Sequence, residues 1–311
     1  MIAVTFPGQG SQSQGMGCDL YAASETARLT YDEASSVLGY DLTELCRVGT
    51  SAELARTEVT QPALLTHSIA ALRLLQEDGF VFDVALGHSL GEYSALVATG
   101  ALGFGDAIRL VKARGEAMAD AAARNPGGMV ALLGLDEATV DELCAAVGQA
   151  WPANFNCPGQ VVVSAAADSL DELEERAQAA GARRVVRLAV AGAFHSPLVA
   201  PAADALRGPL QATDFAEPAP AFFSTCSVDY EVEDFDALLA RQLVSPVRFE
   251  QSVRRLLDEG YNAFLEVGPG NVLSGLVKRI DATAAVGVAG DLESLGRTLD
   301  GSWARSGEGQ S

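Results

Sequence analysis

The chain has 311 residues, of which 49% are hydrophobic, and its formal net charge at pH 7 is −20. A chain of this length can bury a large core and can form one large domain or two smaller ones. The strong negative charge argues against nucleic acid and against anionic membranes as partners, because phosphate groups attract basic surfaces.

The five cysteines and three histidines show neither a metal-binding nor a disulfide pattern. The cysteines form no CxxC pair and no histidine spacing suits zinc, so we expect no metal and no bound cofactor. The first residues lack the basic start and long apolar stretch of a signal peptide, and no run of about 18 apolar residues follows that could span a membrane. We therefore expect a cytoplasmic protein with reduced thiols, and we expect it to be a monomer.

Strands and helices are predicted to alternate in the first and last parts of the chain. Predicted strands cover 2–6, 82–86, 221–226, 263–267 and 285–289, and predicted helices cover 61–78, 92–99, 104–122, 197–210, 235–243, 249–260 and 272–280. This alternation implies a mainly parallel sheet with helices on both faces.

The middle of the chain has a different rhythm. Its pattern predicts strands at 129–135, 153–156, 160–165 and 184–190, with helices at 137–147 and 168–180. The resulting order β-α-β-β-α-β is that of ferredoxin-like domains. We therefore predict an α/β fold with an α/β-hydrolase-like parallel-sheet domain, residues 1–122 plus 191–311, and an inserted small ferredoxin-like subdomain, residues 123–190.

Residues 87–91 read Gly-His-Ser-Leu-Gly and lie between a predicted strand and a predicted helix. A strand, a sharp turn and a helix would place the hydroxyl of Ser89 on an exposed tip, the arrangement called a nucleophile elbow. Side chains at Gly87 or Gly91 would crowd this turn. The alternative interpretation is an ordinary glycine-flanked turn; the surrounding pattern favours a serine suited to acyl transfer.

A serine hydroxyl needs a base to act as a nucleophile at neutral pH, and the chain offers three histidines. His88 adjoins Ser89 but should point to the opposite face, where we expect it to be buried and hydrogen-bonded. His67 lies inside a predicted helix, which favours a core or surface role. His195 lies in a loop of small residues between a strand and a helix, where α/β folds place catalytic groups. His195 is therefore the candidate base.

Six short motifs in series point to a family. They are Phe6-Pro7-Gly8-Gln9-Gly10-Ser11-Gln12, Gly87-His88-Ser89-Leu90-Gly91-Glu92, Arg114-Gly115, Phe194-His195-Ser196, Arg241-Gln242-Leu243 and Glu266-Val267-Gly268-Pro269-Gly270. The series resembles the malonyl-CoA:acyl carrier protein transacylases of fatty-acid synthesis and the acyltransferase domains of polyketide synthases. The resemblance extends over residues 1–290.

This resemblance implies roles for the catalytic residues. Ser89 would be the nucleophile, and His195 would act as general base and then as general acid. The main-chain N–H groups of Gln9 and Leu90 would form the oxyanion hole. Gln242 would help to orient His195 by hydrogen bonding, as a neutral group in the place where a hydrolase has a carboxylate.

The resemblance also implies that Arg114 pairs with the free carboxylate of a malonyl group. Without the resemblance, an arginine on a helix is more often a solvated surface residue. Arginine suits the proposed task because it offers two parallel N–H bonds and a permanent charge. An acetyl group would leave this guanidinium without a partner, so Arg114 provides a mechanism for choosing malonyl over acetyl.

The implied reaction transfers a malonyl group from malonyl-CoA to the phosphopantetheine thiol of acyl carrier protein through a malonyl-serine intermediate, as in fatty-acid synthesis. Three alternatives remain: an acyltransferase of a polyketide pathway, a serine esterase or thioesterase with an acidic partner for His195, and a docking subunit without enzymatic activity. Because carrier proteins are typically acidic, docking requires a local basic patch. The candidate residues are Arg183, Arg184, Arg187, Lys278 and Arg279.

Overall fold

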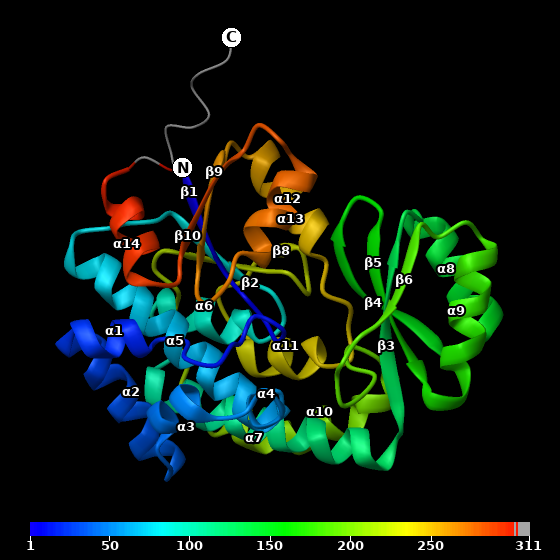
Figure 1. Ribbon diagram of the computed structural model, residues 1–311, viewed down its shortest axis with the longest axis horizontal. Helices are drawn as coiled ribbons and strands as arrows, with labels where there is room; N and C mark the ends of the chain where they lie inside the picture. Colours follow the sequence, from blue (N-terminus) through cyan, green and yellow to red (C-terminus); the bar gives the residue numbers. More distant parts are fainter. Residues whose placement is uncertain (302, 304–311) are drawn as a thin grey trace.

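The computed structural model describes residues 1–301 and 303, and its strands form two sheets (Figure 1). The larger sheet has six strands in the order β10-β9-β1-β2-β7-β8. These strands are β1 (Ile2–Phe6), β2 (Val84–Gly87), β7 (Ala221–Ser224), β8 (Asp229–Tyr230), β9 (Ala263–Val267) and β10 (Ala285–Ala289). All neighbours pair in parallel except β8, which runs antiparallel to β7 at the edge.

Helices cover both faces of this sheet because successive side chains of a strand point to opposite sides. In β1, Val4 packs into the core formed with α5 (Thr57–Glu77), α6 (Gly91–Ala98) and α7 (Phe104–Arg124). The preceding Ala3 packs instead into a second core with α12 (Phe249–Asp258) and α13 (Val272–Ile280). The predicted mainly parallel sheet with two covered faces is thus confirmed.

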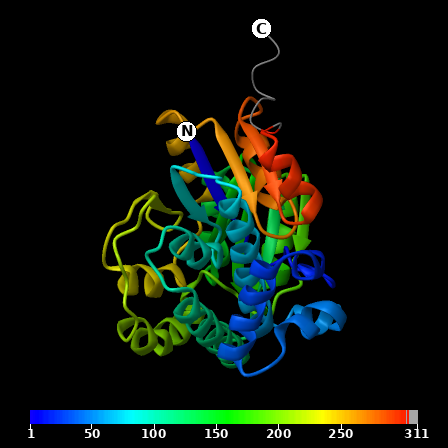
Figure 2. The same ribbon diagram turned by 90° about the vertical axis from the view of Figure 1, so that its left-hand side faces the viewer.

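Four N-terminal helices were absent from our predictions. They are α1 (Cys18–Ala23), α2 (Glu25–Leu38), α3 (Leu42–Val48) and α4 (Ser51–Leu54). Figures 1 and 2 show these blue helices beside the cyan α5. The buried face of α2 includes Ala27, Thr30 and Ala34. These small or polar residues weaken the hydrophobic period from which a helix is predicted.

The smaller sheet lies within residues 127–187 and is antiparallel throughout. Its order is β4-β5-β3-β6, formed by β3 (Gly127–Leu133), β4 (Ala150–Cys157), β5 (Gln160–Ala166) and β6 (Arg184–Arg187). The helices α8 (Glu137–Val147) and α9 (Leu170–Ala179), the latter preceded by η1 (Ala167–Ser169), share its core. Figure 1 shows this unit in green beside the large sheet. The predicted ferredoxin-like order is therefore present.

The boundaries 1–122 plus 191–311 and 123–190 stay a prediction, and the last residues of that division lie outside the described part of the chain. Several strand ends differ from their predictions by two or three residues, and β8 was not predicted. We expected a strand over 184–190, but β6 ends at Arg187. Beyond it, the main-chain N–H of Leu188 still donates to the main-chain oxygen of Met129 in β3 (2.8 Å), and Leu188 and Val190 line a cavity beside Ser89.

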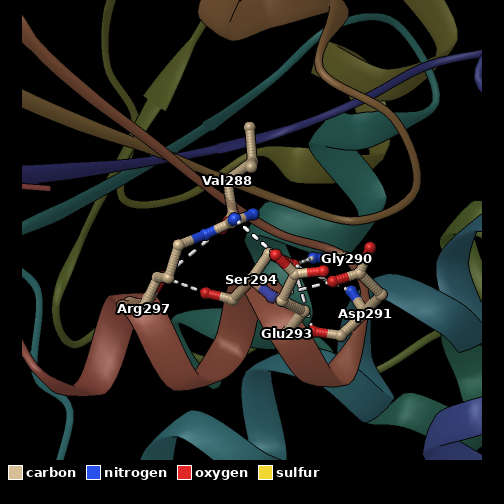
Figure 3. A network of polar contacts seen from close by, with 7 residues as sticks. Val288, Gly290, Asp291, Glu293, Ser294 and Arg297 are labelled. Carbon is tan, nitrogen blue, oxygen red and sulfur yellow. Dashed lines mark hydrogen bonds and ion pairs between the residues drawn. The ribbon is translucent and has the colours of Figure 1, made fainter.

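The remaining helices are η2 (Pro197–Val199), α10 (Ala200–Gln211), α11 (Phe235–Gln242) and α14 (Leu292–Leu299). The helix α14 was not predicted from the sequence pattern. Figure 3 shows the polar network at its start. Asp291 accepts a hydrogen bond from the main-chain N–H of Ser294 (2.8 Å), and Arg297 pairs with Glu293 (2.8 Å). Such a cap satisfies donors that the first helical turn leaves unpaired.

His67 has the core role that its place in a helix suggested. It is 1% exposed, and its Nε2 lies 2.9 Å from the main-chain oxygen of Gly290, directly before α14. The bond ties α5 to the C-terminal part of the fold. Among the helices of residues 1–301 and 303, none is both long enough and apolar enough to cross a lipid bilayer.

Candidate active site

Ser89 lies at the tip of the turn between β2 and α6, with a φ of 53°. The turn is tight because two glycines allow close main-chain contacts. A Cβ atom at Gly87 would lie 1.9 Å from the carbonyl carbon of Gly91, and one at Gly91 would lie 2.0 Å from the main-chain oxygen of Phe6. Only glycine fits either position, so the predicted strand–turn–helix elbow is confirmed.

His195 reaches Ser89 from the loop between β6 and η2. The two residues are 106 positions apart in the sequence, yet Oγ of Ser89 lies 2.8 Å from Nε2 of His195. On the other side of the ring, Nδ1 lies 3.1 Å from the main-chain oxygen of Gln242 and 3.0 Å from that of Ser245. Carbonyl oxygens only accept hydrogen bonds, so the proton belongs on Nδ1. The lone pair of Nε2 then faces the serine hydroxyl.

The surroundings of His195 keep its imidazole neutral at physiological pH. Burial lowers the pKa of His195 from 6.5 to about 3, and the nearby positive charge of Arg114 acts in the same direction. Desolvation penalises the imidazolium form, and a like charge adds to that penalty. The geometry and the charge state are therefore those of a general base.

His88 is hydrogen-bonded as expected, but it is half-buried instead of buried, and it is among the residues that line the cavity beside Ser89. Its Nε2 lies 2.9 Å from Oδ1 of Asn156 in β4, so it links the elbow to the smaller sheet. Gly8 packs against the same residue: a Cβ at Gly8 would lie 2.6 Å from the main-chain oxygen of His88. This contact brings the loop after β1 to the elbow.

A cavity of about 90 Å³ opens beside Ser89, and both Gln9 and Leu90 line it. Neither main-chain N–H is engaged in a hydrogen bond within the part of the chain that the structure describes. Two free N–H groups at the edge of a cavity can stabilise the negative charge of a tetrahedral intermediate. The apolar wall of the cavity is formed by Met118, Met129, Leu188, Val190 and Phe194.

Arg114 lines the same cavity from α7 and is only 1% exposed, so its interpretation as a solvated surface residue is wrong. Its guanidinium donates to Oε1 of Gln61 (2.9 Å) and to Oγ of Ser89 (3.0 Å), while its Nε has no hydrogen-bond partner among the described residues. The next residue, Gly115, brings α7 close to α5, since a Cβ there would lie 2.6 Å from Cα of Glu58. A buried guanidinium with an unused donor is suited to a carboxylate ligand.

Gln242 bonds to His195 as a neutral acceptor, but through its main chain. Its bond to His195 comes from the main-chain oxygen, and the side chain turns away. The amide Nε2 donates to the main-chain oxygen of Ser89 (2.9 Å) and to Oε2 of Glu92 (2.6 Å), while Oε1 accepts from Arg114 (3.1 Å). The side chain of Gln242 therefore positions the elbow and the arginine, not the imidazole.

Three contributors were missing from our predictions: Gln61, Glu92 and the main-chain oxygen of Ser245. Glu92 lies three residues after Ser89 in α6, which is the one local signal among them. Gln61 and Ser245 lie far from the elbow in sequence, and the latter acts through its main chain. Their participation therefore depends on tertiary structure.

These groups together can carry out acyl transfer to and from a serine. The site combines a serine, a neutral imidazole, two free N–H groups and a buried guanidinium around one small cavity. Among the residues that the structure describes, His, Cys, Asp and Glu side chains form no group of three placed to hold a metal ion. The guanidinium favours an acyl group that itself carries a carboxylate.

Comparison with known proteins agrees with this geometry. Residues 4–293 match the family model described as an acyl transferase domain. A malonyl CoA-acyl carrier protein transacylase of Bacillus subtilis (strain 168) is 43% identical over 300 residues, which cover 94% of this chain and 95% of that relative. The transacylase of the same name from Escherichia coli (strain K12) is 41% identical, covering 96% of this chain and 99% of that relative.

Solved structures give the same result. A malonyl-transacylase in complex with a type II polyketide synthase acyl-carrier protein has a TM-score of 0.94 and 41% identity, covering 96% of this chain and 99% of its own. A Streptococcus pneumoniae structure of the same kind of enzyme has a TM-score of 0.92 and 41% identity, covering 97% of this chain and all of its own. The chain therefore belongs to the acyl transferase family, among the malonyl-CoA:acyl carrier protein transacylases.

Proposed function

We propose that this protein transfers a malonyl group from malonyl-CoA to the phosphopantetheine thiol of acyl carrier protein. The observation that carries the proposal is the 3.0 Å contact between the guanidinium of Arg114 and the hydroxyl of Ser89 inside one small cavity. A nucleophile and a fixed positive charge at this spacing fit a short acyl group with a carboxylate at its far end.

In the first half-reaction, Nε2 of His195 takes the proton of the Ser89 hydroxyl as Oγ attacks the thioester carbonyl. The N–H groups of Gln9 and Leu90 stabilise the oxyanion. The C–S bond then breaks, and His195 gives its proton to the departing thiolate of coenzyme A. A malonyl ester of Ser89 remains.

The second half-reaction runs the same steps with the carrier thiol. His195 takes the thiol proton, the sulfur attacks the malonyl ester, and the bond to Oγ of Ser89 breaks as the proton returns to that oxygen. Arg114 holds the carboxylate of the malonyl group in both halves. Its unpartnered Nε and its Nη2 provide the two N–H groups for this pairing.

The contacts of His195 favour transfer over the esterase alternative. A serine hydrolase would place a carboxylate on Nδ1, whereas here Nδ1 meets the main-chain oxygens of Gln242 and Ser245. The buried carboxylate of Glu92 lies in the site, but it bonds to the side chain of Gln242 instead. A polyketide pathway would use the same chemistry, and the carrier that accepts the malonyl group distinguishes the two pathways.

For the carrier-docking surface we favour the end of α13. Lys278 and Arg279 are exposed there, and Arg279 donates to Oε1 of Gln160 at the start of β5 (2.6 Å). Four residues earlier in the chain, Asn156 bonds to His88 beside the elbow, so the hairpin that Arg279 contacts also reaches the elbow. Another candidate, Arg187, is less suitable because it is already ion-paired with Asp171 and Glu174 of α9.

A cytoplasmic location is part of the same proposal. All five cysteines are free thiols, which suits a reducing compartment. Malonyl-CoA and a soluble carrier would both be available to the enzyme in that compartment.

The test of the proposed function is a single-turnover reaction with malonyl-CoA, followed by intact-mass measurement. We expect a malonyl adduct on the protein that is absent in Ser89→Ala. Adding a phosphopantetheinylated carrier should remove the adduct and load the carrier. Release of free malonate without a carrier would support a hydrolase. A protein that forms no malonyl adduct and whose Ser89 does not react with a fluorophosphonate probe would support a docking subunit.

A further inference from the structure

Glu92 is a buried carboxylate within the site that the proposed mechanism does not use. It lies in the first turn of α6 and is 0% exposed. Its Oε2 accepts from Nε2 of Gln242 (2.6 Å), and its Oε1 accepts from Oγ of Ser224 (2.9 Å) and from the main-chain N–H of Thr225 (2.6 Å). A fully buried acid with this many partners is costly unless each bond is made, so its surroundings are specific to it.

Burial raises the pKa of Glu92, while its hydrogen bonds act in the opposite direction and keep Oε2 an acceptor toward Gln242. The amide of Gln242 and the main-chain N–H of Thr225 can only donate at these positions, and the hydroxyl of Ser224 accepts from the N–H of Cys226 (3.1 Å) while it donates to Glu92. The hydroxyl of Thr225 lies 3.0 Å from Oε1 and also donates to the main-chain oxygen of Gly87 (2.8 Å), so a proton on Oε1 has an acceptor while Oε2 still accepts from Gln242. The N-terminal turn of a helix also favours a negative charge.

The acceptor oxygen Oε2 of Glu92 determines which way the Gln242 amide points. Nε2 of Gln242 faces two acceptors, Glu92 and the main-chain oxygen of Ser89, so its Oε1 faces the guanidinium of Arg114 (3.1 Å). In the opposite orientation the amide oxygen would face a carboxylate and a carbonyl, and the amide NH₂ would face the arginine. Both contacts would be repulsive.

From this chain of contacts we propose that Glu92 is a positioning residue, which fixes the amide of Gln242 and, through it, the guanidinium of Arg114, and so sets the preference for acyl groups that carry a carboxylate. The inference deepens the proposed function and rests on the assignment of Arg114 to the malonyl carboxylate.

Placing the negative charge one amide away from the arginine has a consequence for binding. A carboxylate in direct contact with Arg114 would occupy the donors that the substrate needs. Here Glu92 orients the amide of Gln242, and the amide oxygen orients the guanidinium of Arg114. Nε of Arg114 keeps no hydrogen-bond partner among the described residues. The guanidinium at the cavity is thus held in place and keeps one donor without a protein partner in the described part of the chain.

The test compares Glu92→Gln with the wild type in acylation by malonyl-CoA and by acetyl-CoA. The new amide NH₂ at position 92 faces Nε2 of Gln242, which turns the Gln242 amide and brings its NH₂ against Arg114. We expect the ratio of kcat/KM for malonyl-CoA over acetyl-CoA to fall at least tenfold. Ser224→Ala is the matched control, because it removes a donor from the same carboxylate and leaves the Gln242 contact intact; its ratio should stay as in the wild type.

A second variant keeps the test decisive if Glu92→Gln does not fold. Gln242→Met removes the amide that connects Glu92 with Arg114, and it should lower the ratio to the same extent. A wild-type ratio in whichever variant gives a normal melting transition would overturn the positioning role. If instead the wild-type protein takes up no malonyl adduct, the proposed function itself has failed, and the two failures are thereby distinguished.

Discussion

Replacing Arg114 by alanine removes the guanidinium from the cavity and leaves the elbow and the base in place. The side chain extends from α7 to the serine, so its loss opens space at the far end of the acyl pocket. Ser89 and His195 keep their own 2.8 Å contact, which does not involve the arginine. The substitution therefore removes the group that recognises the acyl carboxylate while the nucleophile and the base stay in contact.

The size of the effect follows from the hydrogen bonds of the guanidinium. Nε has no partner, and Nη2 already donates to Ser89 and Gln242. A malonyl carboxylate thus gains one new bond at Nε and takes over an existing one at Nη2. Hydrogen bonds to charged groups contribute about 1.5–3 kcal/mol each, so with one bond replaced we expect a net loss of about 3 kcal/mol, or roughly 100-fold in kcat/KM.

The assay is rapid-quench acylation with malonyl-CoA and acetyl-CoA, read by intact mass. In Arg114→Ala the kcat/KM for malonyl-CoA should fall roughly 100-fold, while that for acetyl-CoA should stay level or rise. Arg114→Lys should lie between the two, because lysine keeps the charge but lacks the planar pair of donors. An unchanged malonyl-to-acetyl ratio in a folded Arg114→Ala protein would refute the assignment.

Three further predictions concern stability and docking. Gly91→Ala places a Cβ 2.0 Å from the main-chain oxygen of Phe6 in β1, so it should lower the free energy of unfolding by more than about 3 kcal/mol. The control is Gly296→Ala in α14, which has open space around it and should raise the free energy of unfolding slightly. Equal changes in the two variants, measured by urea titration, would contradict the close-contact argument. Burial lowers the pKa of His67 from 6.5 to about 4, so the unfolded chain binds a proton there that the folded chain does not. The free energy of unfolding should therefore fall by about 3 kcal/mol as the pH drops from 6.5 to 4, and His67→Gln should flatten this dependence; an equally steep dependence in the variant would argue against it. Reversing the charges of Lys278 and Arg279 together should raise the KM for carrier protein and leave malonyl-CoA acylation unchanged, and equal effects on both half-reactions would exclude docking there.

The elbow could be predicted from the sequence because its determinants are local. The glycines at 87 and 91 flank the serine, and the close contact between these two glycines involves residues only four positions apart. A strand before the turn and a helix after it were visible in the hydrophobic pattern. His195 could be selected among three histidines because its loop follows a strand, although its contact with Ser89 depends on the whole fold.

The burial of Arg114 is also indicated by the residue spacing in its helix, although our predictions did not include it. Ala107, Val111, Arg114, Met118 and Ala121 recur at spacings of three and four, and all are buried on one stripe of α7. A charged residue within an apolar stripe is a candidate for a functional site, since such residues are seldom fully buried without a partner.

The contacts of the arginine could not be predicted in this way. Gln61 and Gln242 lie 53 and 128 positions from Arg114. The orientation of the Gln242 amide depends further on Glu92, 150 positions away from it. Two main-chain oxygens orient His195. Because every residue has such an oxygen, no pattern of side chains in the sequence could have indicated these two.

Arg114 also controls the strength of the base. Burial is the larger cause that lowers the pKa of His195 to about 3, and the charge of Arg114 is the next. A bound malonyl carboxylate offsets that charge, so the imidazole becomes a stronger base once the correct acyl group is present, and an acetyl group brings no such change. Because His195 acts only when neutral, its activity is lost as the pH falls through its pKa, and a raised pKa moves this loss to higher pH. Arg114→Ala should therefore shift the acid limb of Ser89 labelling by a neutral fluorophosphonate probe to higher pH, whereas Arg114→Lys, which keeps the charge, should retain the wild-type limb. The same acid limb in all three proteins would show that the arginine acts on the acyl group alone and not on the base.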